Sequence, residues 1–366
     1  IMHILRLVNF KTTKSWKCLM ATQAWTNNQN AEQACETKIE RLNERSLLKI
    51  KGQDASNFLQ GLITNDINYL FKEKLQTLYT MFLNVRGRVV HDGLVYKTQN
   101  QNCFLIETDI TSLQALQIHL SLYKAHHQVY IENAEPNYSV WAIFNPNKVE
   151  RAFASSLAGS GSLLDDNSDL SFLEEINFGD DVVICYDPRI ISLGTKIVAP
   201  KELDIFNLIK ASGFQLNKAM PGEYRLLRYK LGIGEGINEF QYGKYFPKEL
   251  NCDYLKSLSN KKEAYLGKQF SNFSSEKRMM PIKLLSSEIN GLPINTPLID
   301  LHRRKKTPLG HLRGINGVCG IALVRVPNFD GENEMRIGTH LAQCIKPFWW
   351  PDFGKSLPGR QNISFA

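Results

Sequence analysis

Residues 247–273 concentrate side chains that could hold a ligand. Glu249 and Asn251 lie two positions apart, and because side chains alternate along an extended segment, we expect both to point the same way. A carboxylate and an amide on one side can grip a ring amide or a backbone amide. The same pair could instead fix its own loop through side-chain-to-backbone hydrogen bonds. Tyr265 and Gly267 fit a turn in which glycine allows a close backbone approach.

Asp92 is an isolated acid in the otherwise largely apolar run V-V-H-D-G-L-V of residues 89–95, which we expect to be a strand. Burying a carboxylate is costly unless it is paired or hydrogen-bonded. Asp92 should therefore face a cleft or a cation. It either lines a binding site or pairs with Arg86 or Arg88 across a hairpin.

Three arginines could recognise an anion. Arg86 and Arg88 flank the turn of the expected hairpin, where a guanidinium can pair bidentately with a ligand carboxylate or can simply be solvated. Arg228 follows Tyr224 by one helical turn and lies among leucines. A cation beside an apolar face needs a partner, which can be a carboxylate or a ligand.

The elements that position these residues predict an α+β fold with two α/β-layer domains and a small C-terminal β-barrel. Residues 36–136 read as strand, helix, hairpin, strand and helix, the order of helices packed on a sheet. Residues 137–278 repeat this design and contain the 247–273 segment. Residues 279–327 are short strands separated by Gly and Pro, as in a barrel. In residues 328–366 we expect no regular element.

The expected elements can be given by number. Strands are expected at 45–51, 78–84, 88–96, 103–108, 138–144, 182–186, 195–199, 282–285, 298–301, 309–313 and 318–326, and helices at 54–62, 111–126, 149–158, 202–211 and 223–231.

Composition excludes several classes of protein. No apolar run approaches the roughly 18 residues of a membrane span. The net charge of +8 is weak evidence for nucleic acid, and the basic run at 303–306 reads as a solvated loop. Seven scattered cysteines without a C-x-x-C pair argue against a structural zinc site and against a permanently held cluster. They also fit a reducing compartment.

The first 35 residues differ from the rest of the chain. Residues 1–31 contain no Asp or Glu, while basic residues alternate with apolar ones. This composition predicts a mitochondrial transit peptide, and a disordered tail is the alternative.

Five segments in order resemble one family. They are F-L-Q-G-L-I-T-N-D (58–66), F-L-N-V-R-G-R-V-V-H-D (82–92), D-P-R with L-G (187–194), Y-x-x-x-R-x-x-x-G-I (224–233) and the 247–273 segment. The chain resembles the YgfZ-type branch of the glycine-cleavage T-protein-like family, whose P-x-E-x-N is followed by K-G-C-Y-I-G-Q-E. The match covers roughly residues 40–326 and is most similar to the mitochondrial iron–sulfur assembly factors of that family.

The resemblance implies a ring of three domains around a channel that binds a folate, tetrahydrofolate or a derivative. It implies work in the mitochondrial matrix with A-type scaffold proteins and a ferredoxin, maturing [4Fe–4S] enzymes without a permanently bound metal. The acid that orients the folate in transferase relatives matches Asp92. The implied binding residues are Asn84, Arg86, Arg88, Asp92, Tyr224, Arg228, Glu249, Asn251, Tyr265 and Gly267.

The signature cysteine of the family is replaced by Ala264. A thiolate can bind iron or a persulfide, whereas a methyl group cannot. Glu263 replaces a glycine, and Cys252 could substitute for the thiol only if it lay nearby in space. Either thiol chemistry is not essential, or the function has diverged. A tetrahydrofolate-dependent aminomethyltransferase and a non-catalytic protein-binding relative remain the alternatives to an assembly factor.

Overall fold

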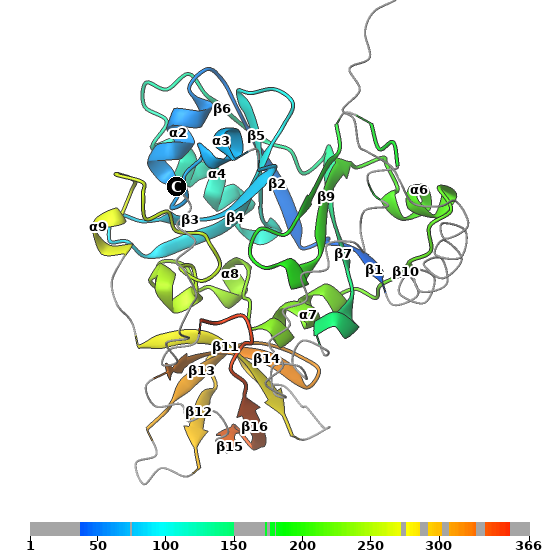
Figure 1. The fold of residues 1–366 in the computed structure, drawn as a ribbon. Helices are drawn as coiled ribbons and strands as arrows, with labels where there is room; N and C mark the ends of the chain where they lie inside the picture. The colour runs from blue at the N-terminus through cyan, green and yellow to red at the C-terminus, as the bar shows by residue number, and fades with distance from the viewer. Residues whose placement is uncertain are drawn as a thin grey trace, which may run out of the picture.

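The computed structural model describes residues 37–73, 75–149, 173, 176–179, 181–271, 276–285, 292–301, 307–326 and 334–351. The expected leader, most of the expected helix 149–158, the basic run 303–306 and the chain beyond 351 lie outside these residues. Two five-stranded sheets with helices form the upper part of the molecule, and a closed barrel forms the lower part (Figure 1). The predicted α+β class and barrel are confirmed.

The first sheet is antiparallel, with the strand order β3-β4-β5-β2-β6. Three helices cover one face, where apolar side chains from both layers form a core. The elements are β2 (Arg45–Lys51), α2 (Ala55–Leu62), α3 (Tyr69–Lys72), β3 (Thr77–Leu83), β4 (Val89–Lys97), β5 (Cys103–Asp109), η1 (Ile110–Ser112), α4 (Leu113–Leu122) and β6 (Tyr130–Asn133).

The second sheet has the order β10-β1-β7-β9-β8. Its strand β1 precedes the whole first sheet in sequence, yet Ile39 of β1 pairs with Ile143 and joins the core of this sheet. The sheet therefore crosses the boundary that the sequence pattern predicts at residue 136. Its elements are β1 (Lys38–Arg41), β7 (Tyr138–Phe144), β8 (Val183–Tyr186), η3 (Ile191–Leu193), β9 (Thr195–Pro200), α6 (Ile205–Ala211) and β10 (Asn217–Lys218).

The uncovered face of the first sheet packs against the second sheet. Leu94 and Leu105 share one core with Val140 and Val198. Because side chains alternate along a strand, a charged residue two positions from one of these leucines or valines must point into the same space. Charged side chains at these positions therefore lie between the two sheets.

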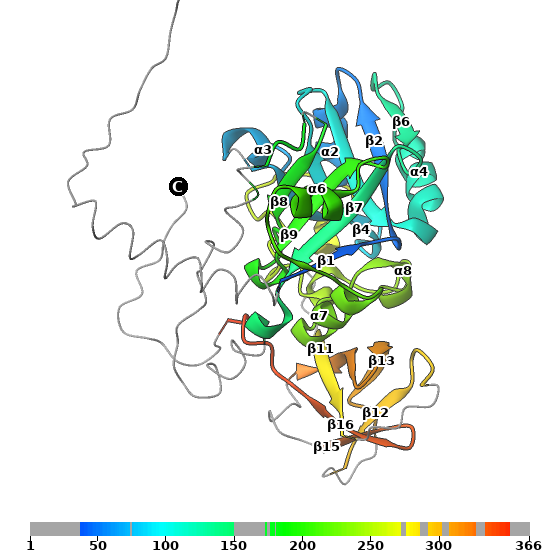
Figure 2. The same ribbon diagram turned by 90° about the vertical axis from the view of Figure 1, so that its right-hand side faces the viewer.

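Short helices connect the sheets to the barrel, and α7 lies between them (Figure 2). Helix α7 has the predicted bounds and ends at Gly232, whose φ of 74° allows the left-handed cap. The connecting elements are α7 (Glu223–Leu231), α8 (Gly236–Glu239), η4 (Pro247–Leu250) and α9 (Lys268–Ser271).

The barrel extends beyond residue 327, where no element was predicted. Strands β15 and β16 complete its closed order β11-β14-β13-β12-β15-β16. Both are short, and β15 offers only Met335 and Ile337 to the barrel core, so the apolar pattern is faint. The Trp349 indole then donates to the Leu231 carbonyl at 2.9 Å, at the end of α7. The strands are β11 (Lys277–Leu284), β12 (Pro297–Asp300), β13 (Gly310–Asn316), β14 (Cys319–Arg325), β15 (Glu334–Ile337) and β16 (His340–Cys344).

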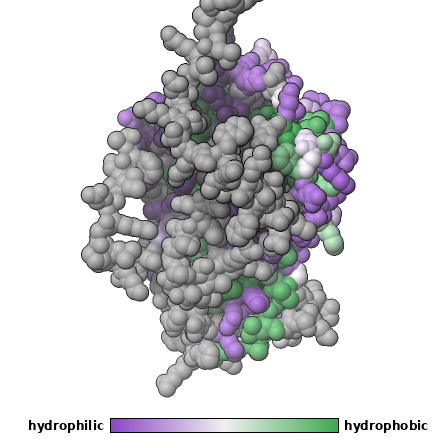
Figure 3. All heavy atoms as spheres, turned by 45° about the vertical axis from the view of Figure 1, so that its right-hand side comes forward, coloured by the Kyte–Doolittle hydropathy of each residue, from purple (hydrophilic) through white to green (hydrophobic). Residues whose placement is uncertain are grey.

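The exposed residues differ in character between the upper lobes and the barrel. Figure 3 shows mostly hydrophilic residues on the coloured part of the upper lobes and an apolar area on the barrel. None of the helices in the described ranges has the length and apolar character needed to cross a membrane. The five cysteines that the structure describes are free thiols.

Candidate functional site

A cavity of about 260 Å³ lies where the first sheet, the connecting helices and the barrel meet. Arg45 at the start of β2 and Arg228 of α7 line it from above. Glu235 and Glu239 line it around α8, and Arg313 of β13 lines it from the barrel. All five side chains are buried, so the cavity is bordered by charges that little water reaches.

Arg228 is held by two carboxylates. Its Nη1 and Nη2 donate to Glu239 at 2.9 and 3.1 Å, and its Nε lies 3.2 Å from a Glu235 oxygen. Arg189 binds Glu235 from the other side and donates to both oxygens of Asp187, at 2.8 and 2.6 Å. Burial alone would raise the pKa of Glu235, but the surrounding cations, Arg228 first among them, hold it well below its usual range.

Glu107 of β5 links the two sheets. It accepts hydrogen bonds from Arg45 Nε at 2.8 Å, from Lys196 of β9 at 2.9 Å and from the Tyr96 hydroxyl at 2.5 Å. Burial alone would raise the pKa of Glu107, but Lys196 and Arg45 lower it to about 2. This carboxylate is therefore charged at physiological pH, together with its two cations.

Asp92 lies beside this network but outside the cavity lining. One oxygen accepts the Gly236 amide at 2.9 Å, and the other lies 3.8 Å from Arg45 Nη2 without a hydrogen bond from any described residue. Burial raises the pKa of Asp92, partly offset by Arg45. The cation that faces Asp92 is therefore Arg45, not Arg86 or Arg88.

The hairpin arginines serve the turn and its neighbours. The Asn84 side-chain oxygen accepts the backbone amides of Arg86 and Arg88, each at 3.0 Å, and so closes the turn. The Arg88 guanidinium donates to the Lys244 carbonyl and stacks 4.0 Å from the Phe246 ring centroid. Arg86 is exposed. None of the three predicted residues reaches the cavity.

Glu249 and Asn251 do not lie on the extended segment that was predicted. Residues 247–250 form the 3-10 helix η4, with Pro247 at its start, and Asn251 follows with a φ of 60°. Glu249 accepts the Phe246 amide at 2.8 Å, and the Asn251 side chain donates to the Met279 carbonyl at 2.8 Å. Proline fixes the φ that starts such a turn. In the structure both side chains fix the loop, which was the alternative interpretation.

Gly267 makes the close approach that was predicted. Its φ is 78°, and a Cβ there would lie 2.5 Å from the carbonyl oxygen of Asn84. The 247–273 segment, which we call the signature loop, is thereby packed on the hairpin turn. Nearby, the Lys262 amine donates to the Ile63 carbonyl at 2.6 Å and lies 5.1 Å from the centre of the Tyr265 ring.

The ten predicted site residues thus fall into two groups. Arg228 lines the cavity, and Asp92 and Tyr224 belong to the adjoining charge network; the Tyr224 hydroxyl donates to Asp187 at 3.1 Å. The remaining seven lie along the hairpin turn and the signature loop: Asn84, Arg86, Arg88, Glu249, Asn251, Tyr265 and Gly267.

Two further members of the network stand out in the sequence by the same pattern as Asp92. Glu107 in C-F-L-I-E-T and Lys196 in T-K-I-V-A are lone charges in apolar strands, as Asp92 is. Each shares the strand face of an inward residue, Leu105 or Val198, and so points between the sheets. Arg45, Glu235, Glu239 and Arg313 had no comparable pattern.

Arg313 determines the kind of ligand that the cavity can bind. Its guanidinium donates to the Glu239 carbonyl at 3.0 Å and to the Asn295 side-chain oxygen at 2.5 Å. No carboxylate of the described residues forms an ion pair with it, although it is fully buried. Buried charges are stabilised by pairing, and a guanidinium pairs best with a planar oxyanion. The cavity can therefore bind a carboxylate or a similar anion.

Cys252 does not replace the missing signature cysteine. Ala264 is exposed at the loop surface. Cys252 is fully buried and burial raises the pKa of its thiol, so it does not present a thiolate there. Within the described ranges, no three His, Cys, Asp or Glu side chains are grouped to hold a metal ion.

Comparisons with known proteins match this architecture. Residues 18–156 match the GCVT N-terminal domain, and residues 276–352 match the CAF17 C-terminal beta-barrel domain. The mitochondrial iron-sulfur cluster assembly factor IBA57 of Homo sapiens is 27% identical over 86% of each chain, and that of Mus musculus is 28% identical over 86% of each chain. The solved glycine cleavage system aminomethyltransferase T from Bartonella henselae has the same fold, with a TM-score of 0.62, 15% identity and 88% of each chain covered.

Proposed function

Because this chain belongs to the glycine-cleavage T-protein-like family, with a CAF17-type barrel at its C-terminal end, we propose that it is a mitochondrial iron–sulfur cluster assembly factor. The observation that carries the proposal is its similarity to relatives of that name along 86% of both chains. In this role it works in the matrix with A-type scaffold proteins and a ferredoxin, and it helps [4Fe–4S] enzymes to mature. The cluster is cargo in this reaction and not a resident cofactor.

The proposed small-molecule ligand is tetrahydrofolate or a derivative, as is general for the family fold. Its glutamate carboxylates fit the chemistry of the cavity, because Arg313 has only neutral oxygen partners there. Arg313 would hold this end of the ligand, and Arg228, which Glu235 and Glu239 hold, would border it. The cavity of about 260 Å³ is near the lower limit of small-molecule pockets, roughly 300 Å³, so it takes part of a folate. When bound, the folate would supply its one-carbon and redox chemistry.

Asp92 has a positioning role in this proposal. Its carboxylate holds the Gly236 amide and faces Arg45, and Arg45 borders the cavity. The hairpin and signature-loop residues are proposed to shape the surface that partner proteins contact. Their hydrogen bonds to the backbone support that role, since they rigidify the turn and the loop.

Rescue of a depleted cell tests the proposal. Human cells that lack their own iron-sulfur cluster assembly factor of this type would receive this chain behind a mitochondrial presequence. We expect aconitase activity and protein lipoylation to recover. Failure at a level at which the human protein rescues would contradict the proposal. Turnover of an aminomethyl donor with tetrahydrofolate by the purified chain would instead identify a transferase.

A further inference from the structure

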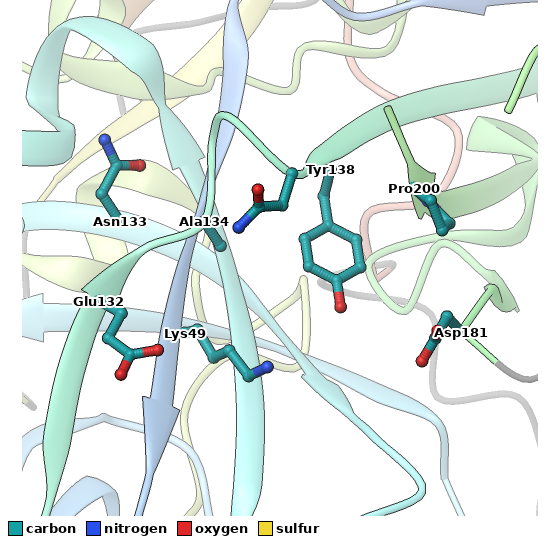
Figure 4. A pocket seen from close by; sticks show the side chains of 8 residues that line it. Lys49, Glu132, Asn133, Ala134, Tyr138, Asp181 and Pro200 are labelled. Carbon is teal, nitrogen blue, oxygen red and sulfur yellow. The ribbon is translucent and has the colours of Figure 1, made fainter. Parts of the chain in front are cut away.

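A second cavity, of about 310 Å³, lies at the seam between the two sheets, and none of its lining residues lines the first cavity (Figure 4). Lys49 of β2 lies on one side. Tyr138 at the start of β7 and Pro200 at the end of β9 lie on the other, with Asp181 just before β8. Ligand sites are frequent at such boundaries between packed layers, because each layer contributes a wall.

The lining contains charged groups that the fold itself does not pair. Lys49 lies directly opposite Glu132 in the strand register, so an ion pair is expected. The Glu132 carboxylate instead binds Lys51 at 2.6 Å. Within the described ranges, the Lys49 amine, the Tyr138 hydroxyl and the Asp181 carboxylate have no hydrogen-bond or ion-pair partner.

The three groups are arranged around one space. Figure 4 shows the Lys49 amine and the Tyr138 hydroxyl directed toward it, with Asp181 on the side away from Lys49. Lys49 and Asp181 form no ion pair with each other and lie on opposite sides of the space (Figure 4). A ligand with an anionic and a cationic end can satisfy both, and the hydroxyl can add a second hydrogen bond to the anionic end.

We infer that this cavity binds a small zwitterion of the α-amino-acid class. The ligand carboxylate pairs with the Lys49 amine and accepts the Tyr138 hydroxyl, and the ligand ammonium pairs with Asp181. Ala134 and Pro200 provide apolar surface for a small side chain. This site is separate from the proposed folate cavity, so the inference does not depend on that proposal.

Saturation-transfer NMR on the full chain tests the inference. The probes are a mixture of the free proteinogenic amino acids, the same amino acids with acetylated amines, and their carboxamides. We expect saturation transfer to one or more of the free amino acids. We expect none to the acetylated amino acids or to the carboxamides. The absence of any signal up to about 10 mM would overturn the inference, as would equal binding of the acetylated set.

Substitutions locate the binding. Lys49→Met and Asp181→Asn should each weaken the binding of the best amino acid at least tenfold, and Tyr138→Phe severalfold. The matched control is Lys210→Met, an exposed lysine on α6, which should bind as the parent does. Of the four substituted residues, Asp181 and Lys210 are exposed, whereas Lys49 and Tyr138 are partly buried. A thermal melt of each variant checks that it folds. Unchanged affinity in folded Lys49→Met and Asp181→Asn would place the amino acid elsewhere and overturn the inference.

Discussion

At the scale of single residues, Arg313 differs from the other buried arginines of the described ranges. Arg45, Arg189 and Arg228 each face at least one carboxylate, whereas Arg313 donates to a backbone carbonyl and an amide oxygen. Burial lowers its pKa, in the direction expected for a cation without full compensation. An incoming carboxylate would supply the missing countercharge, so Arg313 should discriminate between ligands by their anionic end.

Arg313→Met should therefore weaken the binding of 5-formyltetrahydrofolate by about ten- to a hundredfold, the range for a hydrogen bond to a charged group. Titration calorimetry measures the affinity. The effect should vanish for the tetrahydropteroate analogue, which lacks the glutamate. Arg325→Met is the control, because Arg325 is an exposed arginine of the same barrel. An equal loss for both ligands would show that Arg313 does not bind the glutamate.

Position 264 makes the second prediction at this scale. Ala264 is exposed, and the Lys268 amine donates to the carbonyl of Glu263, the residue before Ala264. A thiol introduced by Ala264→Cys would meet solvent near this cation, and a nearby cation lowers a thiol pKa. In the rescue assay, Ala264→Cys should raise aconitase activity above that of the parent chain, and Ala264→Ser should not. No gain would mean that this chain supports maturation without thiol chemistry.

The sequence allows only part of the site to be predicted, and Glu107 explains why. A lone charge in an apolar strand predicts that the residue is buried and paired, which holds for Asp92, Glu107 and Lys196. It does not predict the partner, because the three lie on different strands of two sheets. Arg313 gave no signal, because strict alternation would place it on the opposite face from the buried Leu312, whereas the strand register shifts between Leu312 and Gly314 and both side chains are buried.

At the scale of elements, the contact between the signature loop and the hairpin requires glycine on both sides, at Gly87 and at Gly267. Gly267 combines a φ of 78° with a backbone approach that leaves no room for a Cβ. Gly213 has a similar φ of 88° but open space around it. A comparison of substitutions at Gly267 and Gly213 therefore separates the cost of left-handed backbone strain from the cost of the steric contact.

Gly267→Ala should lower the free energy of unfolding by about 2–4 kcal/mol, the sum of left-handed strain and overpacking. Gly213→Ala should lower the free energy of unfolding only by the backbone strain, about 1 kcal/mol. Urea denaturation of both variants gives the comparison. Equal losses would mean that the loop moves away from the turn at no further cost.

The elements themselves were largely predictable where they are long and regularly patterned. Helix α7 matches its predicted bounds because leucines recur at helical spacing and a glycine ends it. The η4 turn was misread as extended because its packing partners, including Met279, are distant in sequence. Strands β15 and β16 carry little signal in the sequence, because each adds only two inward residues to the barrel that they close.

At the scale of the whole molecule, the charge network joins three bodies, namely the first sheet, the second sheet and the barrel. Glu107 belongs to the first sheet and Lys196 to the second, while Arg228 and Glu239 lie on the connecting helices. Arg313 extends the contacts from the barrel to the Glu239 carbonyl. Buried ion pairs contribute little net stability over apolar packing, but the loss of one partner leaves the others uncompensated. The network should therefore couple the unfolding of the bodies.

Glu107→Gln tests this coupling, because it leaves Arg45 and Lys196 buried without their shared carboxylate. We expect a loss of about 3–5 kcal/mol in the free energy of unfolding at pH 7. Glu132→Gln removes an exposed pair with Lys51 and should change the free energy of unfolding little. Urea denaturation followed by tryptophan fluorescence measures both. A loss for Glu107→Gln as small as that of the control would show that the network does not hold the sheets together.

The pH dependence of the same variant follows from the pKa of Glu107. Its folded value of about 2 lies below the ordinary value of 4.5, so the folded state releases the proton more readily than the unfolded state. The stabilisation is complete above pH 4.5 and is lost as the pH falls toward 2. The difference between the parent chain and Glu107→Gln should therefore shrink by about 1 kcal/mol between pH 7 and pH 4. A difference that stays constant over this range would mean that Glu107 stabilises the fold by packing and not by its charge.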